Sequence, residues 1–237
     1  MTTASPSRRE RLRLATTTEI REAARRLLIA GGPPAISLRA IARDMGLTAA
    51  ALYRYYPSLD ALVIDLGTSL YEELSGAIHA ARDRVPADRP IGRLREMARE
   101  FRRWGLTHPA EFSLIFGSPV PGVTQFEAFG AALQEAGIRC GAAFLLVIGD
   151  LWQVKPFNTP PPAVIDEQLG AHLAPYIAHH GADLPLPVVY TFLAGWTRLY
   201  GMVAMEVFGH LSWALTDSEP LFEMELEATI GQLGVTD

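Results

Sequence analysis

The residues best suited to chemistry lie in the run LTAAALYRYY, residues 47–56. A tyrosine hydroxyl can donate a hydrogen bond to a phosphate, and a guanidinium can bind a phosphate or the acceptor edge of guanine. On a helix, at about 100° per residue, this run divides into two faces. One face consists of Ala49, Ala50, Tyr53 and Arg54, and the other of Ala51, Leu52, Tyr55 and Tyr56. The first face either meets a polyanion or is the ordinary solvated face of an amphipathic helix.

The preceding residues predict the elements that would hold this face. Ser37 can cap a short helix whose apolar residues point inward, namely Leu38, Ile41 and Ala42. Gly46 permits a tight turn, Leu47 is an apolar plug, and Thr48 can cap the second helix. Two short helices joined by a turn of three or four residues with glycine are the layout of a helix-turn-helix. In that layout the two alanines of the second helix leave room for close approach to base edges.

An earlier helix completes a three-helix head. The segment TTTEIREAARRLLIAGG, residues 16–32, begins with threonines that can cap it and ends in glycine. Its apolar face consists of Ile20, Ala23, Ala24, Leu27 and Leu28. The arginine-rich arm before it, Arg8 to Arg13, is expected to be disordered in the absence of DNA. A basic tail without a binding role is the alternative.

Charge is distributed unevenly along the chain. Residues 1–57 carry ten arginines and four carboxylates, a net charge of +6, although the whole chain carries −5. The other residues therefore carry −11. A basic head on an acidic body indicates that the head binds a polyanion and that the body has another task. A helical carrier of small molecules would not need the basic head.

Length and composition predict a cytoplasmic globular protein with no membrane partner. With 237 residues, 49% of them hydrophobic, the chain can fill one large domain or two smaller ones. The longest apolar run, residues 142–148, is far shorter than the roughly 18 residues of a membrane span. No apolar segment follows the N-terminal arginines, so no signal peptide is predicted. The single cysteine, Cys140, agrees with a reducing compartment and is expected to be a small buried hydrophobe.

Helical periodicity, punctuated by proline and glycine, predicts an all-α fold of nine or ten helices. We expect a basic arm and a three-helix, helix-turn-helix DNA-binding domain over residues 1–60. A helical bundle for effector binding and dimerisation is expected over residues 61–237. One long helix is predicted over residues 59–84. Its continuous apolar stripe consists of Leu62, Leu66, Leu70, Leu74 and Ile78.

The helices of the second domain are rich in aromatic residues and glycine. Each ring taken singly is better explained as core, but the rings together with Gly141, Gly149 and Gly195 could leave a gap for an apolar ligand. The predicted ligand site consists of Phe101, Trp104, Phe116, Phe144, Ile148 and Trp152. The last two long helices, about residues 188–211 and 219–233, are the predicted dimer surface, because a two-fold dimer doubles the contacts with a palindrome.

The sequence shows no constellation typical of an enzyme. It holds no HExxH, no P-loop, no GxGxxG after a strand and no cysteine cluster, and no cofactor is predicted. His172, His179 and His180 lie near one another in sequence and could be imagined as a metal site. Adjacent histidines point in different directions on a helix, so no metal site is predicted.

The head resembles the TetR-type transcriptional regulators over about the first quarter of the chain. The matching residues are Ile20, Ala23-Ala24 and Leu27 in the first helix, Gly32, ISLRAIARDMGLT at residues 36–48 and ALYRYYPSLDAL at residues 51–62. The segment GWTRLYGMVAMEVFGHL, residues 195–211, resembles the C-terminal domain of a subgroup named for Trp, His and Gly. Tyr200 stands there at the position of the histidine.

The resemblance assigns roles to residues of the head by position. It implies that Ser37 and Thr48 cap their helices near phosphates. It also implies that Tyr53 contacts a phosphate and that Tyr55 is the residue, usually His or Tyr, beside it. The family commonly has a lysine where this chain has Leu59, and Arg39, Arg43 or the arginine-rich arm can replace that contact. The predicted DNA-binding residues are Ser37, Arg39, Thr48, Ala49, Ala50, Tyr53, Arg54 and Tyr55.

These features predict a ligand-responsive, DNA-binding transcriptional regulator. The resemblance implies a homodimeric repressor that binds a palindromic double-stranded DNA operator. An apolar or aromatic small-molecule effector is expected to release it. The alternatives are a helical protein that binds a small molecule without DNA, and an activator whose DNA binding is not relieved by ligand.

Overall fold

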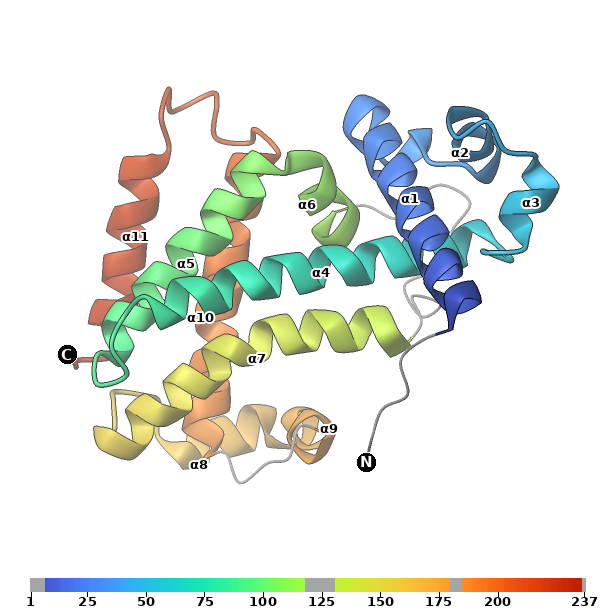
Figure 1. Ribbon diagram of the computed structural model, residues 1–237. Helices are drawn as coiled ribbons and strands as arrows, with labels where there is room; N and C mark the ends of the chain where they lie inside the picture. The colour runs from blue at the N-terminus through green and yellow to red at the C-terminus, as the bar shows by residue number, and fades with distance from the viewer. Residues whose placement is uncertain (1–6, 118–130, 180–184, 236–237) are drawn as a thin grey trace. The chain divides into compact units, whose positions relative to one another are not determined.

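The computed structural model describes residues 7–117, 131–179 and 185–235, and these ranges are helical without a strand (Figure 1). The helices are α1 (Arg8–Gly31), α2 (Leu38–Asp44), α3 (Ala49–Tyr53), α4 (Leu59–Asp83), α5 (Pro90–Thr107), α6 (Pro109–Phe116), α7 (Ala131–Val154), α8 (Pro162–Ile165), α9 (Ala171–His179), α10 (Leu186–Val207) and α11 (Glu219–Gly231). A 3-10 turn, Pro33–Ala35, and a π-helical turn, Asp166–Gly170, lie between them. The predicted all-α fold is confirmed.

The chain forms two compact units, and each unit takes residues from separate parts of the sequence. The first unit comprises residues up to 72 together with residues 108–137, and the second comprises residues 73–107 and 138–237. Helices α4 and α7 therefore contribute to both units. The functional division at residue 60 stays a prediction.

Helix α1 includes the arginine-rich arm. The Ser7 hydroxyl accepts a hydrogen bond from the Glu10 N–H, and the Glu10 carboxylate accepts one from the Ser7 N–H at 2.6 Å. This capping box satisfies two N–H groups at the helix start and so favours helix from Arg8 onward. Thr16 and Thr17, expected to cap the helix, lie inside it and donate to carbonyls four residues earlier. The prediction of a disordered arm is therefore wrong.

The first unit closes around one apolar core. Helices α1, α2, α3, α6 and the first part of α4 supply it, and its fully buried residues include Ile20, Leu28, Ile41, Leu52 and Leu62. Helix α6 belongs to this unit because Leu114 lies in the same core and α6 contacts α1. The predicted stripe of α4 is confirmed, since its five residues are all buried.

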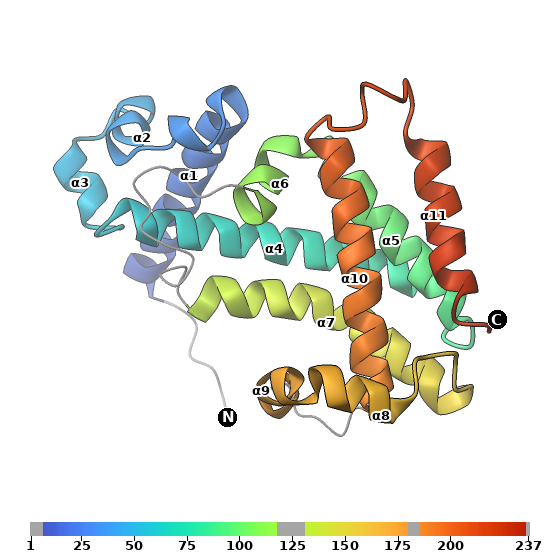
Figure 2. The same ribbon diagram turned by 180° about the vertical axis from the view of Figure 1, so that it is seen from behind.

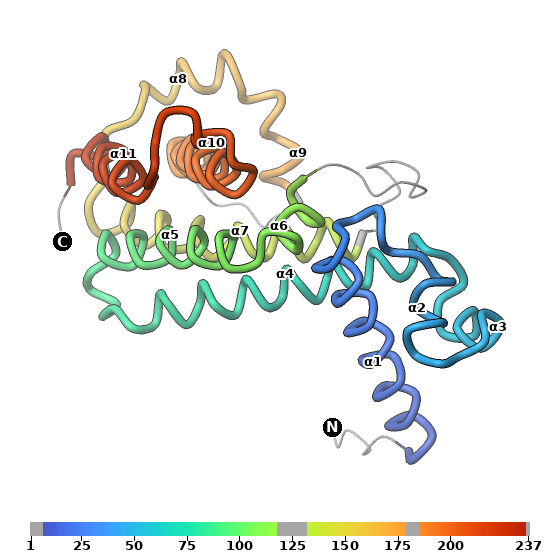
Figure 3. The backbone as a smooth tube through the Cα atoms, turned by 90° about the horizontal axis from the view of Figure 1, so that it is seen from above, coloured from blue at the N-terminus to red at the C-terminus, as the bar shows by residue number. Residues whose placement is uncertain are grey.

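In the second unit, α10 and α11 form a layer over α5 and the adjoining part of α7 (Figure 3). The two helices run in opposite directions and are joined by residues 208–218 (Figure 2). Three arginines of α5 pair with glutamates of this layer. The pairs are Arg95 with Glu227 at 2.7 Å, Arg99 with Glu223 at 2.7 Å, and Arg102 with Glu206 at 2.8 Å. The guanidinium of Arg102 also lies 5.0 Å from the centre of the Phe222 ring.

Helix α7 is the one described helix that is long and apolar enough to cross a membrane. The segment is residues 132–154, with a mean hydropathy of 1.4. Core helices of soluble proteins pass the same test, and 44% of its most apolar window is buried inside the protein. Cys140 lies on this helix, and burial raises the pKa of its thiol to about 12. The prediction that Cys140 is a buried hydrophobe is confirmed.

Candidate nucleic-acid interface and ligand cavity

Two side-chain caps and one glycine shape the helix-turn-helix. The Ser37 hydroxyl accepts a hydrogen bond from the Ala40 N–H at 3.1 Å and so starts α2. The Thr48 hydroxyl accepts one from the Ala51 N–H at 3.1 Å and starts α3. Between the helices Gly46 has φ 65°, a left-handed conformation that a residue with a side chain adopts only with strain. Both caps and the turn lie where the sequence predicted them.

Helix α3 separates an exposed face from a buried one, as the helical wheel predicts. The exposed residues are Ala49, Ala50, Tyr53 and Arg54. Leu52 and Tyr56 are buried, and Tyr55 is half-buried against the apolar core of the first unit. The regular helix ends at Tyr53, and Arg54 is its C-cap. The exposed face therefore presents a hydroxyl and a guanidinium beside two methyl groups.

The arginines of this surface form no ion pair in the described part of the chain. Arg39, Arg43 and Arg54 are exposed, and no carboxylate of the described residues lies within salt-bridge distance of them. Two arginines of α1 differ, since Arg25 pairs with Glu111 and Arg26 with Asp44. Leu59, at the position where the family commonly has lysine, is partly buried and packs against the apolar core of the first unit. The unpaired guanidiniums therefore remain available for phosphates.

Tyr56 fixes the residues that follow α3 to the rest of the first unit. Its hydroxyl donates a hydrogen bond to the Asp65 carboxylate of α4, and Arg21 of α1 lies 3.6 Å from the same carboxylate. Burial, followed by the Asp65 carboxylate, raises the pKa of Tyr56 above its ordinary value. The hydroxyl therefore stays protonated and keeps donating. This contact joins α1, the end of α3 and α4.

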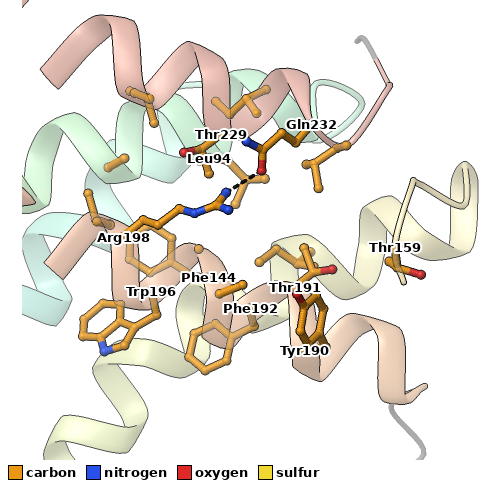
Figure 4. A pocket seen from close by; sticks show the side chains of 18 of the residues that line it. Leu94, Phe144, Thr159, Tyr190, Thr191, Phe192, Trp196, Arg198, Thr229 and Gln232 are labelled. Carbon is orange, nitrogen blue, oxygen red and sulfur yellow. Dashed lines mark hydrogen bonds between the residues drawn. The ribbon is translucent and has the colours of Figure 1, made fainter. Parts of the chain in front are cut away.

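A cavity of about 360 Å³ lies in the second unit among α5, α7, α10 and α11 (Figure 4). Its apolar wall includes Leu94, Phe144, Ile148, Phe192, Trp196 and Leu226. Its polar groups include Thr191, Arg198, Thr229 and Gln232. The volume is typical of a site for a small molecule, and so is the mixture of many apolar residues and a few polar ones.

Two of the six predicted ligand-site residues, Phe144 and Ile148, line this cavity. Phe101 lies just behind it, because its ring is 5.3 Å from the ring of Trp196, which does line it. Trp104 is buried, and its indole N–H donates to the Glu73 carboxylate at 3.1 Å.

The other two predicted residues lie elsewhere. Phe116 belongs to the first unit, where its ring meets Tyr71 edge-on at 5.4 Å. Trp152 packs edge-on against Phe157 at 4.9 Å. The sequence prediction did not include Tyr190, Trp196 and Arg198 of α10, although the segment GWTRLYG was the signal that could have identified the latter two.

No group of three histidine, cysteine or acidic residues with the geometry of a metal site occurs in the described ranges. His180 and the side chain of His179 lie outside the described residues. The described residues thus present an exposed face suited to DNA in the first unit and a cavity in the second.

The capped helix pair, its glycine turn and its exposed arginines define a helix-turn-helix DNA-binding protein. Models of two protein families match the chain. The model for bacterial regulatory proteins of the tetR family matches residues 20–66, and the model for tetracyclin repressor-like C-terminal domains matches residues 94–229. The chain belongs to the TetR family of transcriptional regulators. The resemblance seen in the head therefore extends over the body.

Individual relatives agree with this assignment. The chain is 31% identical to the HTH-type transcriptional regulator Rv1816 of Mycobacterium tuberculosis and to Mb1846 of Mycobacterium bovis, over 91% of each chain. Among solved structures, the regulatory protein SCO4313 is 27% identical, with a TM-score of 0.74 over 96% of this chain and all of that one. A tetR-family regulatory protein from Rhodococcus RHA1 shares the fold at 17% identity, with a TM-score of 0.61 over 93% of this chain and 98% of that one.

Proposed function

We propose that this regulator is a cytoplasmic, homodimeric repressor that binds a palindromic operator and is released by an apolar or aromatic small molecule. The observation that supports operator binding most directly is the exposed face of α3, with Tyr53 and Arg54 beside two alanines. Those side chains match what base edges and phosphates accept in the major groove. The proposed DNA-binding residues are the eight predicted from the sequence.

Dimerisation through α10 and α11 is supported by exposed apolar side chains on these helices and at the C-cap of α10. They are Met205, Phe208, Leu221 and Met224. A single helix-turn-helix reads few base pairs, and a two-fold dimer places a second copy on the other half-site. Half-sites read from one face of the duplex lie about 34–36 Å apart or a multiple of that distance.

The cavity in the second unit supports effector binding. Its aromatic wall, with Phe144, Phe192 and Trp196, suits an apolar or aromatic molecule. A protein of the same fold, RolR, has been solved with the aromatic ligand resorcinol, at 13% identity and a TM-score of 0.58 over 95% of this chain and 90% of that one. Release from DNA requires that the effector bind one conformation of the dimer more tightly than another. A 100-fold release needs about 2.7 kcal/mol of coupling.

Helix α4 is the element we expect to carry this coupling. It contributes Leu62, Leu66 and Leu70 to the core of the first unit and Leu74 and Ile78 to the second. A rotation of α4 would change the distance between the two DNA-binding heads of a dimer, so that they no longer match successive major grooves.

Genomic footprinting with the purified full-length protein tests the proposal. We expect protected palindromes, and the genes beside them narrow the chemical class of the effector. The oligomeric state in solution should be a dimer. Absence of binding to any duplex would favour the alternative of a helical small-molecule-binding protein, and binding that persists at saturating effector would favour an activator.

A further inference from the structure

One charged residue, Arg198, stands in the otherwise uncharged lining that the structure describes for the cavity. Its side chain extends from α10 toward Gln232, the C-cap residue of α11 (Figure 4). Its Nη1 donates a hydrogen bond to the Gln232 Oε1 at 2.5 Å. This bond uses one of the five N–H donors of the guanidinium and none of the charge is neutralised, because an amide oxygen is uncharged.

The surroundings do not compensate this charge. No aspartate or glutamate belongs to the described lining, and no described carboxylate forms an ion pair with Arg198. Arg95, Arg99 and Arg102 of α5 differ, because each pairs with a glutamate of α10 or α11. The cavity therefore has an apolar wall with one uncompensated cation.

Arg198 is exposed, so its guanidinium lies where the cavity meets solvent. An uncharged apolar ligand that covers the guanidinium would displace water from it and offer no hydrogen bond in exchange. A carboxylate would replace that water with charge-assisted hydrogen bonds, and the planar fork of arginine suits a carboxylate in bidentate geometry. The amide NH2 of Gln232, whose oxygen is engaged by Arg198, is a further donor beside it.

We propose that the effector is an anion, a carboxylate on an apolar or aromatic body, with Arg198 and Gln232 binding the carboxylate and the aromatic wall binding the body. This inference rests on the proposed function, since it defines the charge of the effector in that same cavity. It also gives Arg198 a role that explains why the cavity contains a cation.

Calorimetric titration of the full-length protein with 2-naphthoate and with its uncharged counterpart 2-naphthamide tests the inference. Wild-type protein should bind 2-naphthoate about tenfold more tightly or better, the amount expected for one charge-assisted hydrogen bond near solvent. Arg198→Gln should bring the ratio of the two affinities close to one by weakening 2-naphthoate alone. Lys155→Gln removes the same charge from an exposed residue outside the lining and should leave the ratio unchanged.

Gly195→Leu tests the location of binding. Gly195 lines the cavity, and a Cβ added there meets nothing within 4 Å, so the substitution starts in open space and the larger side chain takes up room at the cavity wall. It should weaken both probes equally. An unchanged ratio in Arg198→Gln, a ratio near one in wild type, or binding of neither probe would overturn the inference.

Two further measurements separate the possible failures. If Arg198→Gln changes the oligomeric state and not the ratio, the cation serves contact between copies and the inference is wrong. If 2-naphthoate binds with the expected ratio but leaves operator affinity unchanged, the anion site stands and the proposed release from DNA fails.

Discussion

Arg25 of α1 and Glu111 of α6 form an ion pair, with 2.9 Å between Nε and Oε1, and the Glu111 side chain is only 3% exposed. The pair joins a helix of the predicted DNA-binding head to a later helix, and its two residues are 86 positions apart in the sequence. Both belong to the first unit, so the unit is held together across a long separation in sequence.

Loss of Arg25 should therefore destabilise the protein. Arg25→Ala leaves the Glu111 carboxylate buried without this partner, and we expect a loss of about 3 kcal/mol in the free energy of unfolding, measured by urea denaturation. Arg26→Ala is the matched control, because its pair with Asp44 is exposed and should contribute less than about 1 kcal/mol. Equal effects of the two substitutions would show that burial of Glu111 is unimportant.

Substitutions on the exposed face of α3 should differ in what they change. Arg54→Ala should weaken the free energy of operator binding by about 1–3 kcal/mol and relax base preference at one position in each half-site. Tyr53→Phe should instead weaken binding to all DNA sequences alike, because a phosphate contact is lost. Binding to a panel of operator variants, with a sequence change at each position, measures both. Uniform weakening by both substitutions would assign Arg54 to the DNA backbone.

Operator affinity should fall steeply with salt, because arginines of the head release counterions from phosphates. The slope of log affinity against log salt is about −0.9 for each phosphate contacted. Arg8→Ala and Arg13→Ala, on the exposed first turns of α1, should each make the slope less steep by about one if they contact the duplex. Slopes equal to that of wild type would show that these turns do not reach DNA.

The pairs between α5 and α11 predict acid sensitivity in the second unit. Hydrogen bonds from Arg99 and Arg95 lower the pKa of Glu223 and of Glu227. A lowered pKa in the folded state means that this stabilisation is present above the unfolded pKa, near 4.5, and is lost as the pH falls through the folded values. Unfolding free energy should decline below about pH 5, and the double substitution Glu223→Gln, Glu227→Gln should flatten that decline. The effect should be modest because both carboxylates are largely solvated.

Much of the head could be predicted from the sequence because local signals determine it. Ser37, Gly46 and Thr48 act on their own neighbours, and the stripe from Leu62 to Ile78 repeats along a single helix. The start of α1 was missed although its signal was local as well. Ser7 and Glu10 form the capping box, whereas the threonines predicted as caps lie inside the helix.

The cavity could not be predicted in the same way. Periodicity shows which face of a helix is buried, but not which ring fills a space and which leaves one. Phe144 and Trp152 look alike in the sequence, yet the first lines the cavity and the second packs on Phe157. That difference depends on where the helices cross, which is a property of the assembled unit.

The two-segment makeup of the first unit limits how such regulators can exchange operator specificity. A recombination event that swapped residues 1–60 between relatives would separate Arg25 from its Glu111 and the head core from Leu114. The incoming segment would have to match an α6 that it did not evolve with. New specificity in this scaffold should therefore arise mainly by single substitutions on the exposed surface of α3, where Ala49, Ala50, Tyr53 and Arg54 can change without disturbing the interior.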